Sequence, residues 1–352
     1  MSTLVHLLDD VAFGGVTRFV EALTARLGTN VQQMCRSVQP LTERPPRLDH
    51  DIVVVHFTAS WRKLPYLIGL RALRGSRPIV IMEHSYTDAY ERHFVTRPRR
   101  FRVMLRIAYG LADRVVAVSY AQGAWMRRAR LLTASKLVVI PPFTDCGALT
   151  DVALPVSNTA PLRLGAYGRY CQIKGFDTLI AAMRQVGPDV ATLDLRGFGP
   201  DAEALGVQAA EMPHVTIGGK VDDLVHYLKG IDAVVVPSRQ ESFGQVALEA
   251  RLAGRPVIVT NVGGLPEQVE PAHGVVVPAN DPGALAEAIE ALAETKRRGQ
   301  LPAMSASARQ SAAEHFLTSS TRWLTLIQDL LIQDLAKPAN RPIAGTMASA
   351  RA

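Results

Sequence analysis

Two glutamates on either side of a predicted helix start are the residues best placed to do chemistry. Residues 237–250 read PSRQESFGQVALEA and carry Glu241 and Glu249, eight positions apart. The preceding apolar run 233–236 predicts a buried strand, and Gly244 directly precedes a pattern typical of a helix. The first N–H groups of a helix have no partner within it, so this helix start is a potential anion site. Two carboxylates could then bind hydroxyl groups at both ends of a ligand whose phosphates lie between them. A glutamate on its own is more often solvated, but the combined pattern favours a binding site.

Two cations follow the next conspicuous strand pattern. Arg169 and Lys174 stand in GRYCQIKGF (168–176), directly after the apolar run 162–166. In open α/β sheets, ligands bind at the carboxyl ends of the strands. A guanidinium can bind phosphate oxygens in a bidentate fashion, and an ammonium adds a compact point charge. In isolation the two residues could also be solvated surface cations.

A glycine pair and a histidine complete the candidate site. Gly14 and Gly15 open the predicted helix 16–27, where a backbone without side chains can approach an anion. The pair is not part of a G-x-G-x-x-G fingerprint, so a nicotinamide dinucleotide is poorly supported. His84 ends the predicted strand 79–82. A lone histidine is more often structural than catalytic, but the carboxyl end of a strand also suits a site residue.

The elements that must position these residues are short strands alternating with helices, which is typical of an α/β fold with parallel sheets. β-Branched and apolar runs predict strands at 4–8, 52–55, 79–82, 115–118, 137–140, 162–166, 192–195, 215–217, 233–236, 257–260 and 274–277. Helical spacing predicts helices at 16–27, 176–186, 221–229, 245–253 and 282–293, with only helical signal beyond Leu301.

A length of 352 residues suits two cores, and the pattern restarts after a linker-like stretch at 151–161. We predict a first domain at 1–155, a second at 156–318, a helix crossing back to the first at 319–336, and a disordered tail at 337–352. The first 155 residues hold 21 Lys and Arg against 12 Asp and Glu, whereas the remainder holds 18 against 20. A basic first half suggests an anionic partner.

The composition points to a folded protein of a reducing compartment. Its residues are 48% hydrophobic and 20% charged, which excludes wholesale disorder. No apolar run is long enough for a spanning helix, and the N-terminus lacks the features of a signal peptide. Three cysteines without metal-ligand spacing argue against a disulfide scaffold or a zinc site. We therefore expect a cytoplasmic location.

Taken together, these residues resemble the retaining nucleotide-sugar glycosyltransferases of family 4. The resemblance covers roughly residues 4–300 and is densest over 162–277. It implies the GT-B fold, in which two Rossmann-like doubly wound domains face each other across a cleft and a C-terminal helix crosses back to the first domain. It also implies a nucleotide-diphosphate sugar as donor substrate and a glycan or a lipid-linked molecule as acceptor. The motif VGGLPE at 262–267 matches a turn of that family.

The resemblance assigns a role to each candidate residue. Glu241 would lie at the donor sugar and Glu249 would bind the ribose hydroxyls, while His84 would lie near the donor sugar and the acceptor. The cations would bind the donor diphosphate together with the glycine loop, and the backbone at the helix start would assist. The remaining assigned residues are Arg169 and Lys174 for the diphosphate and for catalysis, Gly14 and Gly15 for the diphosphate, Ser242, Phe243, Gly244 and Gln245 for the donor, and Lys220 and Val221 for the base.

Glycosyl transfer must stabilise a departing nucleoside diphosphate, and two helix N-termini with two cations supply positive potential without a metal. Asp49-His50-Asp51 looks like a metal-binding D-x-D motif, but it precedes a predicted strand instead of following one, so we interpret it as a turn. Retention requires departure and attack on the same face or a short-lived double displacement, and the sequence favours neither.

A basic amphipathic helix is predicted over residues 97–108. Its apolar residues form one stripe, and Arg99, Arg100, Arg102 and Arg106 lie mostly off it. This pattern suits peripheral contact with an anionic membrane surface, but it equally suits a stripe packed on the sheet with solvated arginines. Nucleic acid is less favoured, because the aromatic residues expected of a single-strand platform are missing.

We therefore predict a retaining, metal-independent hexosyltransferase of cell-envelope or exopolysaccharide synthesis. Two alternatives remain open. A GT-B nucleotide-sugar 2-epimerase would need a further set of carboxylates or histidines around the sugar. A non-catalytic binder of nucleotide sugar or glycan would bind without hydrolysis or transfer.

Overall fold

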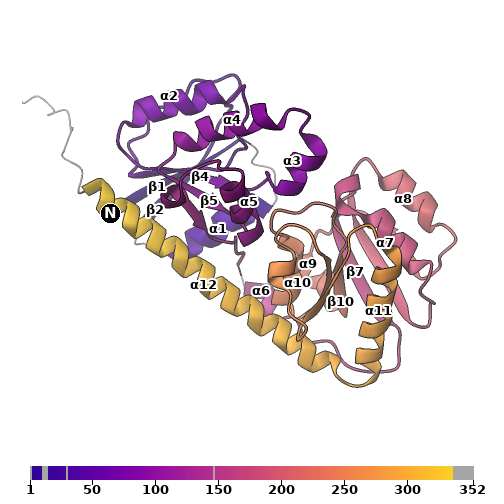
Figure 1. The fold of residues 1–352 in the computed structure, drawn as a ribbon. Coiled ribbons are helices and arrows are strands. Elements are labelled where there is room, and N and C mark those ends of the chain that lie inside the picture. Colours follow the sequence, from indigo (N-terminus) through magenta and orange to yellow (C-terminus); the bar gives the residue numbers. More distant parts are fainter. Residues whose placement is uncertain (1, 10–14, 29–30, 146, 336–352) are drawn as a thin grey trace, which may run out of the picture.

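The structure is a computed structural model that describes residues 2–9, 15–28, 31–145 and 147–335. Within these residues the chain forms two lobes, each built on a six-stranded parallel sheet flanked by helices (Figure 1). A long C-terminal helix lies along both lobes (Figure 1). The predicted α/β architecture of two doubly wound parallel sheets is confirmed, and the domain limits given above stay a prediction.

The first sheet has the strand order β2-β1-β3-β4-β5-β6, and its neighbouring strands are all parallel. Its central strands are rich in valine and isoleucine and are buried, as expected of parallel strands covered on both faces. The elements of this lobe are β1 (Ser2–Leu8), α1 (Gly15–Leu27), β2 (Val31–Ser37), β3 (Ile52–Val55), α2 (Leu64–Arg74), β4 (Ile79–Glu83), α3 (Asp88–Phe94), α4 (Pro98–Gly110), β5 (Arg114–Ala117), α5 (Tyr120–Arg128), β6 (Leu137–Val139) and α6 (Gly147–Thr150).

The second sheet has the order β12-β11-β10-β7-β8-β9 and is also parallel throughout. Its elements are β7 (Leu162–Arg169), α7 (Phe176–Met183), β8 (Ala191–Phe198), α8 (Ala202–Ala209), β9 (Val215–Gly218), α9 (Leu224–Lys229), β10 (Ala233–Val236), α10 (Gln245–Leu252), β11 (Val257–Thr260), β12 (Gly274–Val277) and α11 (Pro282–Arg297). Because parallel strands end at the same edge, the loops after β7, β10 and β11 meet there.

The sequence does not predict β2, because its residues VQQMCRS are largely polar. The strand lies at the edge of its sheet, where exposed side chains are tolerated. The C-terminal helix also differs from expectation: α12 runs unbroken from Leu301 to Leu335, so residue 318 lies inside it. In the described part of the chain, no helix is both long and apolar enough to cross a membrane.

A shared core holds the two lobes together. One cluster of buried side chains includes Phe19 of α1, Val234 of β10, Leu248 of α10 and Trp323 of α12. Trp323 packs on Phe19 with 5.6 Å between the ring centroids, so the end of α12 is anchored on the first lobe. Arg309, nearer the start of α12, donates to the backbone carbonyl of Ala253 at 3.3 Å in the second lobe. The helix therefore fixes both lobes relative to one another.

Candidate active site

Glu249 is a buried carboxylate shared by the two lobes. It lies on α10 of the second lobe and is only 3% exposed. Its Oε1 forms an ion pair with Nη1 of Arg18, which comes from α1 of the first lobe. The hydroxyl of Tyr167 donates to its Oε2 at 2.9 Å. Burial raises the pKa of Glu249, and Arg18 and Tyr167 oppose that shift.

Lys174 and Glu241 form the second charged pair of the site. The Lys174 Nζ lies 2.6 Å from Oε2 of Glu241, and the Ser238 hydroxyl lies 3.3 Å from the same oxygen. Burial lowers the pKa of Lys174, but the neighbouring Glu241 carboxylate outweighs burial, so the net shift is upward. The ammonium group is therefore fully charged at neutral pH.

Two loops are tied together to form this pair. The backbone N–H of Arg239, after β10, donates to the carbonyl of Ile173 at 2.8 Å. Its guanidinium binds both carboxylate oxygens of Asp177 at 2.7 Å each. Gly175 adopts a φ of +66°, and a Cβ there would lie 2.1 Å from the carbonyl oxygen of Pro237. The close approach of the two loops thus depends on a glycine at this position.

The turn at 262–267 supports the same loop from the other side. Gly263 has a φ of +53°, and a Cβ there would lie 1.6 Å from the carbonyl oxygen of Glu241. A Cβ on Gly264 would lie 2.7 Å from the carbonyl oxygen of Ser242. The glycines of this motif therefore position the Glu241 loop by allowing backbone to lie against backbone.

Glu267, at the end of that turn, joins the lobes. Its carboxylate accepts from the backbone N–H groups of Tyr120 at 2.8 Å and Ala121 at 2.6 Å. Both belong to the first turn of α5 in the first lobe, where a carboxylate is favoured by the helix dipole. The contact adds a further link between the lobes at the level of the candidate site.

Two helix N-termini meet between the lobes. The side-chain amide of Gln245, the first residue of α10, donates to the carbonyl of Gly15, the first residue of α1, at 3.4 Å. A Cβ on Gly15 would lie 3.1 Å from Cγ of Gln245. Each N-terminus carries a partial positive charge, so their convergence favours an anion at this point. Gly14, the other predicted glycine, lies outside the described residues.

His84 lies beside this region, directly after β4, and is half-buried. Its carbonyl accepts a hydrogen bond from the hydroxyl of Ser242 in the second lobe. Burial lowers the pKa of His84 to about 4, so its imidazole is neutral at physiological pH. The preceding Glu83 is buried and accepts from the backbone N–H groups of Ser85 at 2.9 Å and Tyr86 at 3.0 Å. Glu83 therefore shapes the loop that carries His84.

Comparison with known proteins identifies the family. The family described as Glycosyltransferase Family 4 matches residues 18–147, and the one described as Glycosyl transferases group 1 matches residues 161–295. A D-inositol 3-phosphate glycosyltransferase from Corynebacterium urealyticum is 37% identical over 350 residues, covering 91% of this chain and 81% of the relative. The chain belongs to glycosyltransferase family 4.

Other relatives agree with membership of family 4. A GDP-mannose-dependent alpha-(1-6)-phosphatidylinositol monomannoside mannosyltransferase from Mycobacterium tuberculosis is 29% identical, covering 80% of this chain and 75% of the relative. The chain spans about half the length of three other relatives named D-inositol 3-phosphate glycosyltransferase, namely 51%, 56% and 41%. The Anabaena protein HepE in complex with UDP and glucose has the same GT-B fold, with a TM-score of 0.70, 19% identity, and coverage of 92% of this chain and 99% of HepE.

In this family 4 chain, most of the predicted site residues come together at the facing edges of the two sheets. Lys174 contacts Glu241, and Gln245 contacts Gly15. Glu249 contacts Arg18 and Tyr167 instead. Arg169 is the last residue of β7, three positions beyond the predicted end of that strand, and its side chain is exposed. Phe243 is buried and stacks on His315 with 5.4 Å between the ring centroids. The Phe243 side chain is therefore packed inside the protein.

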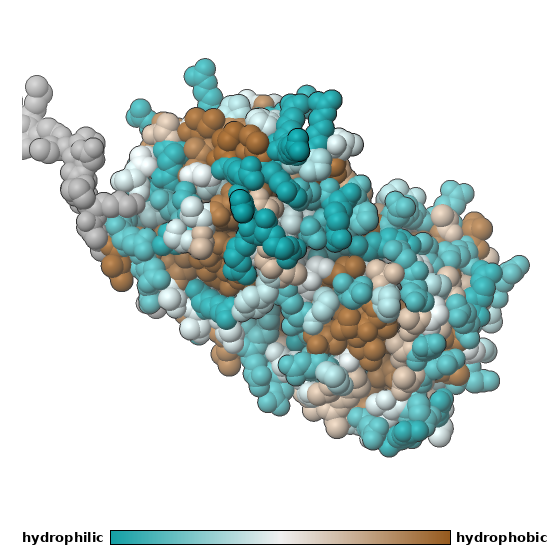
Figure 2. Space-filling model, in the orientation of Figure 1, coloured by the Kyte–Doolittle hydropathy of each residue, from teal (hydrophilic) through white to brown (hydrophobic). Residues whose placement is uncertain are grey.

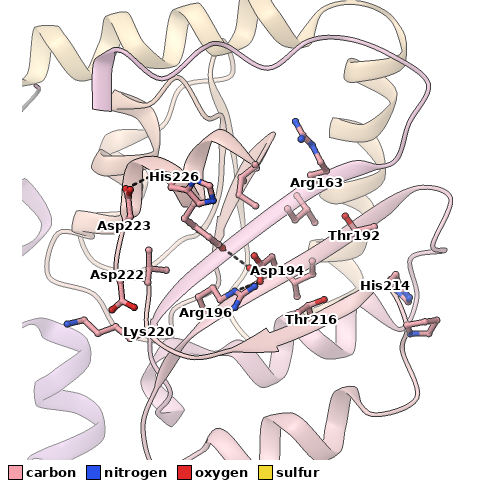
Figure 3. A pocket seen from close by; sticks show the side chains of 17 residues that line it. Arg163, Thr192, Asp194, Arg196, His214, Thr216, Lys220, Asp222, Asp223 and His226 are labelled. Carbon is pink, nitrogen blue, oxygen red and sulfur yellow. Dashed lines mark hydrogen bonds and ion pairs between the residues drawn. The ribbon is translucent and has the colours of Figure 1, made fainter. Parts of the chain in front are cut away.

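Lys220 and Val221 lie apart from the charged pairs, on a cavity of about 620 Å³ in the second lobe (Figure 3). The cavity is lined by residues of α9 and of β7, β8 and β9, and neither Glu241 nor Glu249 lines it. Figure 3 shows Lys220 at one end of the cavity and His214 at the other. The bottom of the cavity includes the Asp194–Arg196 ion pair at 2.5 Å.

The apolar stripe of α4 is buried in the first lobe. Phe101, Met104, Leu105 and Ala108 all belong to its core. The stripe therefore packs on the sheet, which is one of the two arrangements that the sequence allowed, and the arginines cover the outer side of the helix. Figure 2 shows strongly hydrophilic side chains gathered over the α3–α5 part of this lobe.

The sequence does not predict Arg18 and Tyr167 as partners of Glu249. Arg18 lies one helical turn after Gly15, and Tyr167 lies two residues before Arg169 at the end of β7. Their positions at a helix start and at a strand end were available signals. What no local pattern indicates is that both side chains converge on one carboxylate.

The D-x-D sequence at 49–51 has a structural role. The carboxylate of Asp51 accepts from the backbone N–H of Thr3 at 2.8 Å, and Arg74 donates to the carbonyl of Asp51 at 2.9 Å. Among the described residues, no group of three His, Cys, Asp or Glu side chains is arranged to hold a metal ion.

Proposed function

We propose that this family 4 protein is a retaining glycosyltransferase that moves a sugar from a nucleotide-diphosphate donor to a glycan or lipid-linked acceptor in cell-envelope or exopolysaccharide synthesis. The observation that supports it best is the convergence of the N-termini of α1 and α10 at Gly15 and Gln245. Two like dipole ends repel unless an anion lies between them. A diphosphate supplies that anion, and the UDP bound by HepE is a diphosphate of this kind.

The donor is then held from both lobes. We assign the diphosphate to the two helix starts with Lys174 and Arg169, and the ribose hydroxyls to Glu249. Glu241 binds the sugar hydroxyls, with the backbone of Ser242 to Gln245 beside it. The base lies toward Lys220 and Val221. This placement puts the sugar next to His84, whose carbonyl already contacts Ser242.

Catalysis follows from charge development on the leaving diphosphate. As the bond to the sugar breaks, negative charge grows on the phosphate oxygen, and fixed donors stabilise that charge without reorganising. Lys174 supplies a full charge, and each helix N-terminus contributes up to ~2 kcal/mol in a partly buried site. Removing one such donor typically lowers kcat by about 10²–10³-fold. We propose that these protein groups suffice without a divalent ion.

The experiment compares Lys174→Met with Lys229→Met, an exposed lysine of α9. Donors carrying UDP, GDP, ADP and dTDP are first screened by thermal shift, since a ligand at 100 times its Kd stabilises by ~2.7 kcal/mol. We expect K174M to lose about 10²–10³-fold in kcat and K229M to keep its activity. Full activity in K174M contradicts the assignment.

The same assay separates the alternatives. Formation of an epimer of the sugar without any acceptor indicates the 2-epimerase, and binding without hydrolysis or transfer over a broad acceptor panel indicates a non-catalytic binder. Retention is read from the anomeric configuration of the product by NMR. Turnover lost after dialysis against EDTA, and restored by a divalent cation, contradicts metal independence.

We further propose that the outer side of α4 contacts an anionic membrane surface on the cytoplasmic side. The first 155 residues hold the excess of positive charge, and Val103 and Ile107 of α4 remain 44% and 40% exposed. Arg102 is engaged by Glu91 at 2.5 Å, and Arg106 donates to the carbonyl of Arg130 at 2.9 Å. Arg99 and Arg100 at the start of the helix are both exposed, and Arg100 lies over the Trp61 ring with its Cζ 5.4 Å from the ring centroid. These two are the arginines that we expect to meet lipid phosphates.

The membrane contact is tested by co-sedimentation with vesicles of phosphatidylcholine alone or with 30% phosphatidylglycerol. Each arginine near an anionic surface contributes ~1 kcal/mol, so the double variant R99E/R100E should bind at least ~30-fold more weakly. The matched control is R297E/R298E in the second lobe. Equal binding of both variants, or binding that does not fall with salt, contradicts the proposal.

A further inference from the structure

Three histidines from neighbouring strands of the first lobe form a continuous hydrogen-bonded row. His6 lies in β1, His56 directly after β3 and His84 directly after β4. Nδ1 of His6 lies 2.8 Å from Nε2 of His56, and Nδ1 of His56 lies 3.0 Å from Nε2 of His84. The rings of His56 and His84 stack with 5.3 Å between centroids. His6 is fully buried and His56 is 7% exposed.

The row ends at a glutamine on the edge strand β2. Oε1 of Gln33 lies 3.0 Å from Nε2 of His6. The other side of the same amide, Nε2, lies 3.5 Å from the carbonyl oxygen of Leu23 in α1. A carbonyl oxygen can only accept, so the amide nitrogen must face Leu23 and the amide oxygen must face His6. The orientation of Gln33 is therefore set by the backbone of α1.

The orientation of Gln33 determines which nitrogen of each histidine ring carries its proton. Burial lowers the pKa of His6 and of His84 to about 4 and that of His56 well below its usual value, so all three rings are neutral at physiological pH. A neutral imidazole has one donor and one acceptor nitrogen. His6 must donate from Nε2 to Gln33, so its Nδ1 accepts from Nε2 of His56. Nδ1 of His56 then accepts from Nε2 of His84.

The last ring is left with an unprotonated Nδ1. Among the residues that the structure describes, this atom has no hydrogen-bond partner. A ring whose conjugate acid has a pKa near 4 is too weak a base to take a proton from an alcohol at neutral pH. It can still accept a hydrogen bond and so orient a hydroxyl group.

We propose that Gln33 is a positioning residue which, through His6 and His56, holds His84 as the Nε2–H tautomer and presents its Nδ1 to a substrate hydroxyl. This inference rests on the proposed glycosyl transfer, because it needs a sugar or acceptor hydroxyl at His84. Without Gln33 the row can reverse, since each neutral ring can exchange its donor and acceptor. Reversal would place a proton on Nδ1 of His84, which then donates where the substrate requires an acceptor.

The test uses Gln33→Met, which keeps the length of the side chain and removes its acceptor. Gln32→Met on the same strand is the matched control, since successive strand residues face opposite sides and Gln32 is exposed. Gln33→Glu is the rescue variant, because its carboxylate keeps an acceptor facing His6. Should Q33M fail to fold, Gln33→Asn takes its place in the experiment, because its shorter side chain moves the acceptor away from His6 by one methylene.

Two readouts are taken on the full chain with ¹⁵N-labelled histidine. Long-range ¹H–¹⁵N spectra of the imidazoles, assigned with single histidine variants, report the tautomer without any substrate. We expect His6, His56 and His84 as Nε2–H in the wild type, Q32M and Q33E, and a mixture of tautomers in Q33M. In transfer assays we expect Q33M to lose about tenfold in kcat with an unchanged KM for the donor, and Q33E to recover most of it.

The proposal is overturned if Q33M keeps the wild-type tautomers, or if its tautomers change while kcat does not. It is also overturned if kcat falls while the tautomers stay the same, because the role of Gln33 is then only structural. The spectra need no turnover, so they test the histidine row even if the wild-type protein transfers no sugar. Transfer that depends on Lys174 but not on Gln33 leaves the proposed function standing and removes this inference.

Discussion

Replacing Glu249 with glutamine separates the function of this residue from its effect on stability. The change keeps the shape of the side chain and removes its charge. A hydrogen bond to a charged group contributes about 1.5–3 kcal/mol, and a carboxylate that binds both ribose hydroxyls makes two of them. Glutamine keeps one acceptor oxygen, so we expect a net loss of ~3 kcal/mol, or about 100-fold in the Kd for the nucleotide.

The same change should not destabilise the free protein. Burial raises the pKa of Glu249, so its contribution to stability is fully present below the unfolded-state value of 4.5 and is lost as the pH rises through the folded-state value. E249Q removes a buried charge that is unfavourable at neutral pH. The Arg18 side chain stays 31% exposed and can be hydrated, and the Tyr167 hydroxyl can donate to the amide oxygen. We therefore expect the Tm at pH 7 to be equal to that of the wild type or higher.

The assay is isothermal titration with the nucleoside diphosphate selected by the donor screen, together with thermal melts at pH 4 and pH 7. The matched control is Glu287→Gln, an exposed glutamate of α11. Nucleotide binding by E249Q as tight as that by E287Q would refute the assignment of Glu249 to the ribose. A Tm at pH 7 several degrees below the wild type would show instead that the Arg18 ion pair mainly stabilises the contact between the lobes.

Three further outcomes follow from the structure. Gly263→Ala should lower the free energy of unfolding by more than ~1–2 kcal/mol and reduce activity. The φ of this residue is +53°, and the new Cβ would lie 1.6 Å from the carbonyl oxygen of Glu241. A urea unfolding curve and a kcat equal to those of the wild type would contradict this prediction. Trp323→Ala should cost ~3–5 kcal/mol in urea unfolding, because it removes the buried contact with Phe19, and a loss below ~1 kcal/mol argues against that anchor. Burial lowers the pKa of His6 to about 4. The stability that its neutral form contributes is therefore fully present above the unfolded-state pKa of 6.5 and falls between pH 6.5 and 4. A free energy of unfolding, measured with urea, that stays constant over this interval contradicts the prediction.

The α/β architecture could be predicted because it depends on local patterns. A continuous apolar run such as AVVV at 233–236 is typical of a strand that is buried on both faces. The amphipathic helices predicted between such runs are the elements that cover those faces. Where the local pattern is weak, prediction fails. The polar strand β2 is stabilised by pairing with β1 and not by its own composition, and the full length of α12 depends on two lobes that support it.

Local sequence patterns indicate which residues stand at strand ends and helix starts, and so which could do chemistry. Glu241 lies in the loop that leads into the helix of Glu249, so their spacing in the sequence is enough to relate their positions. Which partner each of these residues faces depends on how the chain packs in three dimensions. Arg18 and Glu249 are 231 positions apart, and Gln33 reaches His84 through side chains on separate strands. Periodicity predicts which way a side chain points from its own helix or strand. The packing of the two lobes sets how far apart these elements lie, and so which side chains meet.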